Sequence, residues 1–380
     1  MRILLLIFTF SIGVSGFSQP TLQHYGGMQF HEGAQVGLYG SFVNQAPFEQ
    51  DAGLLGFYGF GELRISGDFA PLLYDTEIFR GPSVILDQSM SVANNLNFIQ
   101  GDLETDKALP ELSVTLLQDA FTVGEANRSK VNGYVTVINQ SSMVFPVGDA
   151  AEYRPLTLEG AVFPIAKCAY FRENPNAPSA FPPFRTDLKP LSIAAISTTE
   201  FWRLEGSSTG QVTLSWNPNS NLGNIATSVG EVTLMGWRKA TQRWESLGTQ
   251  SVVGDLLSGF AISEPLTPDA YEILTFGSLA QPVEIPTLDN YFMSPNGDGI
   301  NDVLIIEELV DSRNNKLQIF DRNGLKVFEL NNYQDEFDGT ANVNSLIINQ
   351  NAGLSEGVYF FLATLFDLGL EFQGFLYLDR

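Results

Sequence analysis

Leu54–Phe60 (LLGFYGF) and the segment Leu63–Phe69 (LRISGDF) decide the fold class of this chain. Each is a short apolar or alternating run that ends near a glycine, and Val36–Asn44 and Val92–Ile99 continue the pattern. Short strands at roughly ten-residue spacing are typical of a β-sandwich, a barrel or a solenoid. We therefore expect an all-β region over residues 19–190. The sequence contains no exact repeat unit, so a β-solenoid and a sandwich both stay open.

The composition agrees with a chain of strands and tight turns. The 380 residues include 35 Gly, 29 Phe and 19 Pro, a balance that favours strands over helices. With 44% hydrophobic and 17% charged residues, the chain can fill large cores. Its length indicates two to three domains.

The first residues have the layout of an export signal. Arg2 precedes the apolar run Ile3–Phe10, and the small residues Ser15, Gly16 and Ser18 follow. This order predicts a secretory signal peptide over residues 1–18, although a buried strand is an alternative interpretation. The run is shorter than the ~20 residues that span a bilayer. We expect a mature chain from Gln19, with no transmembrane segment.

The charge of the chain excludes one class of partner. The formal net charge is −23, and loss of Arg2 with the signal peptide makes it −24. A chain this acidic repels phosphate backbones, so nucleic-acid binding is not expected. Acidity suits solubility outside the cell.

The chain is poor in the residues that most catalytic sites require. Cys168 is the only cysteine, so no intrachain disulfide can form, and we expect it to be a small buried residue. His24 and His31 are the only histidines, which removes most routes to a zinc site or a Ser-His-Asp triad. We therefore expect no enzymatic activity and no cofactor. The alternative is a secreted hydrolase, since a glycosidase needs only two carboxylates.

Residues 191–278 predict an Ig-like β-sandwich. Gln211–Trp216 alternates apolar and polar residues, and Glu231–Trp237 is a second strand candidate. A linker over residues 279–287 follows, and its two prolines favour an extended form. Tryptophans in this region either fill the sandwich core or form a stacking platform for a glycan. They are Trp202, Trp216, Trp237 and Trp244.

Residues 288–380 predict a separate module, also an Ig-like sandwich. Strand candidates include Val303–Ile306, Lys316–Phe320 and Leu325–Glu329. Asn323-Gly324 lies between the last two, and this dipeptide favours a hairpin turn.

The module opens with a loop rich in side-chain oxygens, Ser294–Asp302 (SPNGDGIND). Four oxygen-bearing side chains lie within the seven residues 296–302, and the glycines allow carbonyl groups to curl inward. Ca²⁺ prefers six to eight oxygen ligands, so the loop is a candidate calcium site, although its spacing is not that of an EF-hand. The alternative is a set of Asx-turns, in which Asn and Asp cap their own backbone. The candidate ligands are Asn296, Asp298, Asn301 and Asp302.

Several motifs of this module occur together and in order. They are Ser294–Asp302, Ile319–Gly324, Val327–Glu329, Tyr333, Phe337–Gly339, Gly357–Phe361 and Gly374–Arg380. As a set they resemble the gliding motility-associated C-terminal domain of Bacteroidetes, a type B sorting domain of type IX secretion. Family members often carry Trp in place of Phe337, and Asn-Arg-Trp-Gly in place of Asp321–Gly324.

The resemblance implies how the protein reaches its destination. It implies passage through the periplasm and then export, with the protein secreted or held on the outer cell surface. The implied partner is the type IX machinery, including an outer-membrane β-barrel protein that reads the folded module. We expect a structural or adhesive protein whose passenger contacts an extracellular protein or glycan, and the family name implies an association with gliding.

Overall fold

The computed structural model describes residues 21–190, 192–280, 291–306, 309, 312, 314–343, 353–366 and 370–380. The predicted signal peptide (1–18) and most of the predicted linker lie outside these residues. The chain divides into two compact units. The first contains residues up to 188 together with 197–276, and the second contains residues 189–196 and 277–380. Each unit is described separately below.

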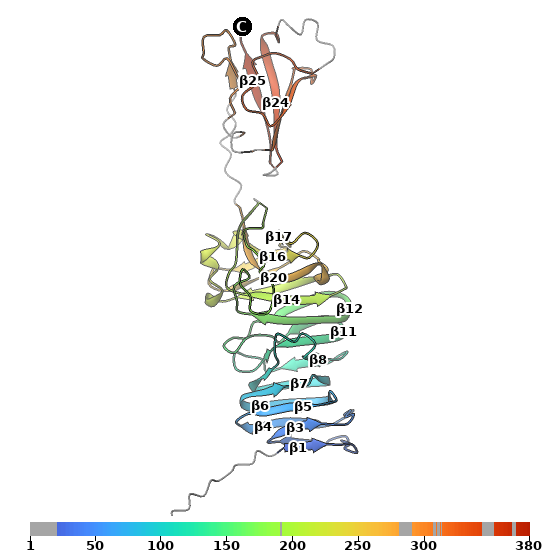
Figure 1. The fold of residues 1–380 in the computed structure, drawn as a ribbon. Coiled ribbons are helices and arrows are strands. Elements are labelled where there is room, and N and C mark those ends of the chain that lie inside the picture. Colours follow the sequence, from blue (N-terminus) through green and yellow to red (C-terminus); the bar gives the residue numbers. More distant parts are fainter. Residues whose placement is uncertain are drawn as a thin grey trace, which may run out of the picture. The chain divides into compact units, whose positions relative to one another are not determined.

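The first unit begins as a parallel β-solenoid (Figure 1). Three ladders of parallel strands run through it: β1–β3–β5–β6–β7–β10, β2–β4–β6–β7–β9 and β6–β7–β8–β11. Thr21 pairs with Ser41 and Thr76 with Leu96, so one turn of the solenoid takes about 20 residues. The strands are β1 (Thr21–His24), β2 (Gln35–Leu38), β3 (Ser41–Asn44), β4 (Leu54–Phe60), β5 (Leu63–Gly67), β6 (Leu72–Leu86), β7 (Met90–Glu104), β8 (Ser113–Leu116), β9 (Phe121–Val123) and β10 (Val131–Asn132).

Apolar side chains stack inside the solenoid from one turn to the next. Successive side chains of a strand point to opposite faces, so alternate residues of every turn face inward. The inward residues meet in register and are almost completely buried. Three such stacks are Phe42–Ile65–Leu86, Phe57–Ile78–Phe98 and Leu73–Val92–Leu116–Val137. Burying each side chain contributes about 1.5–3 kcal/mol, so the stacks hold the turns together.

The sequence therefore predicted the all-β class correctly, and the structure decides for the solenoid. One predicted element differs in detail. Val36–Asn44 was expected to be a single strand, but it breaks at Tyr39-Gly40 into β2 and β3. These two strands belong to different ladders, so the break is a corner of the first turn.

Strand β11 (Tyr134–Phe145) converts the parallel solenoid into an antiparallel sheet. It pairs in parallel with β8 on one edge and antiparallel with β12 (Leu156–Phe171) on the other. Strand β12 then pairs with β14 (Phe201–Gly206) and β15 (Gly210–Trp216). Residue 190, the predicted domain boundary, thus lies between strands that pair in one sheet. The remaining strands of the first unit are β16 (Val232–Arg238), β17 (Arg243–Ser246), β18 (Ser251–Gly254), β19 (Gly259–Ile262) and β20 (Tyr271–Leu279), whose last three residues belong to the second unit. Strand β13 (Ile193–Ile196) lies in the second unit and pairs antiparallel with those last residues of β20.

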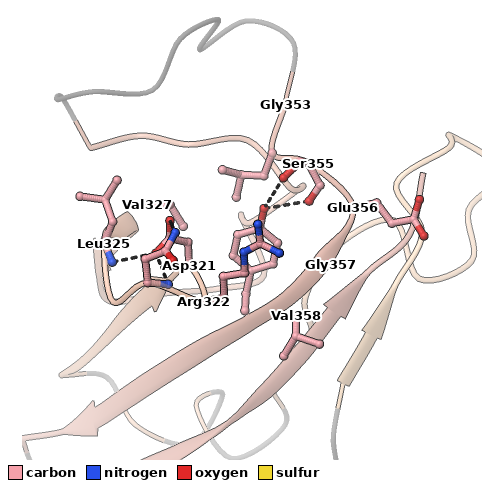
Figure 2. A pocket seen from close by; sticks show the side chains of 12 residues that line it. Asp321, Arg322, Leu325, Val327, Gly353, Ser355, Glu356, Gly357 and Val358 are labelled. Carbon is pink, nitrogen blue, oxygen red and sulfur yellow. Dashed lines mark hydrogen bonds between the residues drawn. The ribbon is translucent and has the colours of Figure 1, made fainter.

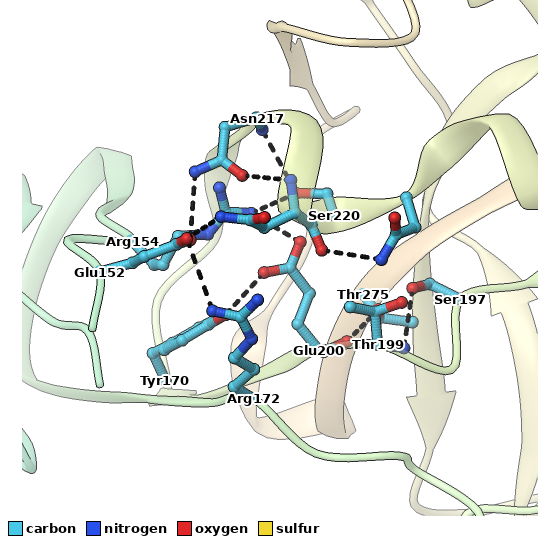
Figure 3. Close-up of polar contacts among 12 residues, drawn as sticks. Glu152, Arg154, Tyr170, Arg172, Ser197, Thr199, Glu200, Asn217, Ser220 and Thr275 are labelled. Atoms are coloured by element: carbon cyan, nitrogen blue, oxygen red, sulfur yellow. Dashed lines mark hydrogen bonds and ion pairs between the residues drawn. The ribbon is translucent and has the colours of Figure 1, made fainter. Parts of the chain in front are cut away.

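A buried ion pair ties this region together (Figure 3). The Arg154 guanidinium donates to Glu200 at 2.6 Å and to the Ser220 hydroxyl at 2.8 Å. Tyr170 donates its hydroxyl to the second Glu200 oxygen at 2.8 Å. Arg154 and Glu200 are each only 2% exposed, so the pair is desolvated and its members depend on one another. The network connects β12, the segment before β14 and the 3₁₀ turn Pro218–Ser220.

The second unit contains a five-stranded sheet in the order β21-β25-β24-β22-β23. The pairs are antiparallel except β21–β25, which is parallel. One face of the sheet covers a separate core that includes Leu317, Ile319 and Phe361. The strands are β21 (Tyr291–Met293), β22 (Asn315–Phe320), β23 (Lys326–Asn331), β24 (Gly357–Leu365) and β25 (Leu370–Leu378).

One predicted strand of this unit is absent. Val303–Ile306 has no strand pairing, although Leu304 and Ile306 are buried and Ile305 between them is exposed. The Leu304 N–H donates to the Phe337 carbonyl at 3.0 Å, and the Leu304 carbonyl accepts from the Tyr333 hydroxyl. The alternation is therefore that of an extended segment lying on the core. Strands β21 to β25 form one sheet here, and the Ig-like assignment stays a prediction. Among the described residues, no helix is long and apolar enough to cross a membrane.

Candidate functional site in the C-terminal unit

The outer face of the C-terminal sheet carries an aromatic surface. Val358 pairs with Tyr377 and Phe360 with Phe375 across β24 and β25, and Phe292 on β21 pairs with Tyr377. These side chains point away from the core and are 40–49% exposed. The Phe292 and Tyr377 rings are stacked with centroids 6.0 Å apart, and the Phe360 and Phe375 rings are 5.2 Å apart. We call Phe292, Val358, Phe360, Phe375 and Tyr377 the aromatic face.

The other half of the same sheet face is polar. On β22 and β23, Glu329 accepts a bond from Gln318 at 2.8 Å and pairs with Lys326 and, at 3.4 Å, with Lys316. The hydrogen bond from Lys326 and that from Gln318 lower the pKa of Glu329 to about 2, so it stays ionised. The face thus combines an apolar half on β21, β25 and β24 with a charged half on β22 and β23, and protein-binding surfaces usually combine apolar and polar parts.

A hollow of about 630 Å³ lies beside the β22–β23 turn (Figure 2). The turn is fixed by the Asp321 carboxylate, which accepts bonds from the Asn323 and Leu325 amides at 2.9 and 2.8 Å. Gly324 has a φ of 80°, which a glycine adopts without strain. This confirms the predicted Asn-Gly hairpin. On the opposite wall, the Tyr359 hydroxyl donates to the Ser355 carbonyl at 2.8 Å.

The predicted calcium ligands lie together in the exposed Ser294–Asp302 loop. Asp302 accepts bonds from the Gly297 and Gly299 amides at 2.8 and 2.7 Å, and these bonds hold its pKa below the usual range. Asn296 accepts from the Asp298 amide, and Asp298 accepts from the Ile300 amide. Asn301 has a left-handed φ of 53°, and its carbonyl accepts from the Ser294 amide.

These contacts are Asx-turn chemistry, the alternative interpretation of the loop. Each carboxylate oxygen here accepts one amide, and such an oxygen has capacity for a second partner. The loop holds its shape through these amide bonds without an ion, and its carboxylate oxygens could still accept one. Calcium binding stays a prediction. The aromatic face was not predicted from the sequence. Its signal was present, since Val358–Phe361 places apolar residues on both faces of one strand.

Three other groups of residues singled out from the sequence lie in the first unit: the cysteine, the tryptophans and the histidines. Cys168 is fully buried, as expected, and burial raises the pKa of its thiol well above the ordinary value. All four tryptophans are at most 3% exposed, so they fill cores and cannot form a glycan-stacking platform. His24 is buried beside Asn44, with Nδ1 2.6 Å from Oδ1, and His31 is exposed.

The fold and these surfaces define a class: a β-solenoid region followed in sequence by an all-β unit that has its own core and an exposed aromatic face. Residues 287–378 match a family model, that of the CHU_C Type IX secretion signal domain. This match confirms the sorting domain that the sequence motifs indicated. The protein is therefore targeted to type IX secretion, which exports it to the cell surface or into the medium. Comparison with curated proteins and with solved structures found no match.

Proposed function

We propose that this protein is an exported structural or adhesive protein, and that the secretion machinery recognises the folded surface of its C-terminal unit. The observation that carries the proposal is the aromatic face on a unit with a separate core. Folding buries one side of the sheet and leaves five apolar side chains on the other. Exposed apolar patches with polar borders commonly mark interaction sites.

The partner in this proposal is an outer-membrane β-barrel protein of the machinery. The aromatic face offers large rigid side chains, which contribute most of the binding energy in protein interfaces. The lysines and the carboxylate of β22 and β23 then set the orientation of docking.

Binding rather than catalysis is proposed for the passenger. The thiol of Cys168 is buried and its raised pKa disfavours the thiolate, so it lacks the character of a nucleophile. His24 is packed against Phe48, with ring centroids 5.2 Å apart, and is placed as a core residue. A role in gliding would be one use of such a surface protein. Loss of gliding on deletion of the gene, restored by the wild-type chain, is the measurement that tests it.

The export proposal is tested by deleting residues 288–380 and measuring where the protein accumulates. We expect retention in the periplasm, because the recognised unit is gone. Unchanged release into the medium would remove the sorting role.

A point variant tests the aromatic face itself. We expect Phe360→Ser with Phe375→Ser to reduce export strongly while leaving the core intact. Phe366→Ser is the matched control, since Phe366 is 53% exposed but lies after β24, outside the aromatic face. Equal export of the double variant and the control would contradict recognition through this face.

A further inference from the structure

A second exposed aromatic surface lies on the solenoid, on the outward side of the ladder formed by β2, β4 and β6. Tyr58 pairs with Phe79 on the next turn, and Tyr39 follows the end of β2 beside them. Tyr39 is 68% exposed, Phe79 is 47% exposed, and Phe60 at the end of β4 is 91% exposed. The Tyr39 and Tyr58 ring centroids are 5.8 Å apart. Successive turns thus present a column of aromatic rings on the outside of the solenoid.

Tyr58 lies flat over two glycines. A Cβ built on Gly37 would come within 2.9 Å of the Tyr58 ring, and one built on Gly56 would overlap the ring. Any side chain at either position would therefore displace the ring from the sheet. The Tyr58 ring rests on the backbone of two adjacent strands, and the residue as a whole is half-buried.

Polar groups lie directly beside this ring and hold it in place. The Tyr58 hydroxyl donates to Glu77 at 2.8 Å, and Asn97 donates to the other Glu77 oxygen at 2.9 Å. On the same face, Asn94 donates to Asp75 at 2.7 Å. Burial and the Glu77 hydrogen bond raise the pKa of Tyr58 to about 12, so the phenol keeps its proton. Carboxylates and amides thus alternate along the edge of the ring column.

Arg80 fixes the turn that presents Phe60. Its guanidinium is almost fully buried and donates to the carbonyls of Gly61 at 3.0 Å, Glu62 at 3.2 Å and Phe60 at 3.3 Å, as well as to that of Tyr58. Four backbone acceptors on one cation leave the turn little freedom. The surface is therefore ordered before any ligand arrives, which lowers the entropy cost of binding.

We propose that the column Tyr39, Tyr58 and Phe79, with Glu77 and Asn97, binds a neutral β-1,4-linked polysaccharide along the solenoid axis. This inference rests on the proposed binding role of the passenger and names its ligand class. A sugar ring with equatorial hydroxyls has flat C–H faces that stack on the negative face of an aromatic ring. Its hydroxyls then meet the carboxylates and amides at the edge. Turns spaced by ~4.8 Å supply one ring for each step along the chain.

Charge selects against other polymers. Asp75 and Glu77 lie on the surface itself, and the whole chain carries a net charge of −23. An anionic polysaccharide would be repelled, whereas a neutral one meets hydrogen-bonding groups without a charge penalty. The proposal therefore commits to a neutral occupant.

The test is affinity electrophoresis of the purified full-length chain in gels that contain hydroxyethylcellulose, galactomannan or polygalacturonate. We expect retardation in a neutral gel and none in polygalacturonate. Tyr39→Ala should weaken binding about tenfold, which corresponds to about 1.4 kcal/mol. Tyr25→Ala is the matched control, since Tyr25 is a similarly exposed tyrosine outside the column, and it should bind as the parent does.

Two further variants separate binding from folding. Phe79→Ala removes an exposed ring and should weaken binding with an unchanged thermal midpoint. Glu77→Gln keeps the shape of the side chain but removes its charge and one of its two acceptor oxygens, so it should weaken binding by releasing the Tyr58 ring or Asn97. The proposal is overturned if no neutral gel retards the chain, or if Tyr39→Ala and Phe79→Ala migrate like the Tyr25→Ala control. Tyr39→Ala should still be exported normally, so loss of binding and loss of sorting are distinguishable.

Discussion

Side chains alternate between two faces along the strands of both units, but the two units differ in what covers those faces. In the solenoid, inward residues of each turn stack on those of the next, so Phe57, Ile78 and Phe98 are enclosed by neighbours about 20 residues away. In the C-terminal unit, β24 carries apolar residues on both faces, and only one face is covered. The comparison teaches that an alternating strand defines two faces, while the pairing of strands decides which face becomes a core and which becomes a binding surface.

Breaking the buried ion pair should have the largest effect, and in the first unit alone. We expect Glu200→Ala to cost about 4 kcal/mol, because it leaves the Arg154 guanidinium buried without its partner. All four tryptophans lie in this unit, so urea denaturation followed by tryptophan fluorescence reports on it specifically.

The control is Glu205→Ala, which removes a partly exposed pair with Arg203 and should cost less than about 1 kcal/mol. If both variants lost the same free energy of unfolding, burial of the Arg154–Glu200 pair could not be the cause of the loss.

Truncating one core side chain of the second unit tests whether the two units have separate cores. We expect Leu317→Ala to cost about 3 kcal/mol, because a fully buried side chain leaves a cavity. Hydrogen exchange of peptides from β22 and β24 should speed up, while the tryptophan transition stays in place. A shift of that transition would argue against two separate cores.

The sequence predicts many of the strands in both units, but it does not predict how they pair. Alternation located β4 and the β22–β23 hairpin, because each is a local pattern closed by glycine. It did not distinguish a solenoid from a sandwich, since the turns share a length and a burial pattern but no common residues. It also assigned Val303–Ile306 as a strand, because burial alternates there without a neighbouring strand.

The candidate sites could likewise be predicted only where they consist of residues close together in the sequence. The motif set identified the sorting domain, and the oxygen-rich loop was located correctly as a cluster. The aromatic face and the ring column depend on which strands are neighbours. Val358, Phe360 and Phe375 become one surface only through the β24–β25 register, and Tyr58 meets Gly37 only through β2–β4 pairing.

The first unit should also respond to alkaline pH in a way that the second does not. The Lys107 ammonium donates to the Gly148 and Tyr170 carbonyls at 3.0 and 2.7 Å, and burial lowers its pKa to about 8. Its ordinary value is about 10.4. Between pH 8 and pH 10.4, Lys107 keeps its proton in the unfolded chain but has lost it in the folded chain. This group alone therefore makes the free energy of unfolding rise with pH.

The Lys107 contribution is expected to be about 1.5 kcal/mol from pH 8 to pH 9.5, measured by urea denaturation with tryptophan fluorescence as the difference between the parent and Lys107→Met. The buried Cys168 and Tyr170 have raised pKa values and oppose this gain equally in both chains, because the unfolded chain loses their protons first. The Lys107→Met variant should lack this rise. A parent chain whose stability is flat or falling over the interval, with the variant behaving identically, would contradict the assignment.

Calcium should produce the smallest effect, confined to the second unit. If the Ser294–Asp302 loop binds the ion with a Kd near 1 mM, as extracellular modules do, 1 mM calcium stabilises it by about 0.4 kcal/mol. We expect slower hydrogen exchange in the C-terminal unit on addition of calcium, and its reversal by a chelator. Asp302→Asn should abolish the response, whereas no response in the parent would leave the Asx-turns as the whole role of the loop.

The turn length of the solenoid also bears on how this protein can change over evolutionary time. Because each turn of about 20 residues meets its neighbours through the same inward stacks, duplicating one turn adds a layer without creating a new kind of contact. Each added layer lengthens the passenger by about 4.8 Å. Relatives of different lengths are therefore expected to differ by whole turns, and the column of rings would lengthen in the same steps.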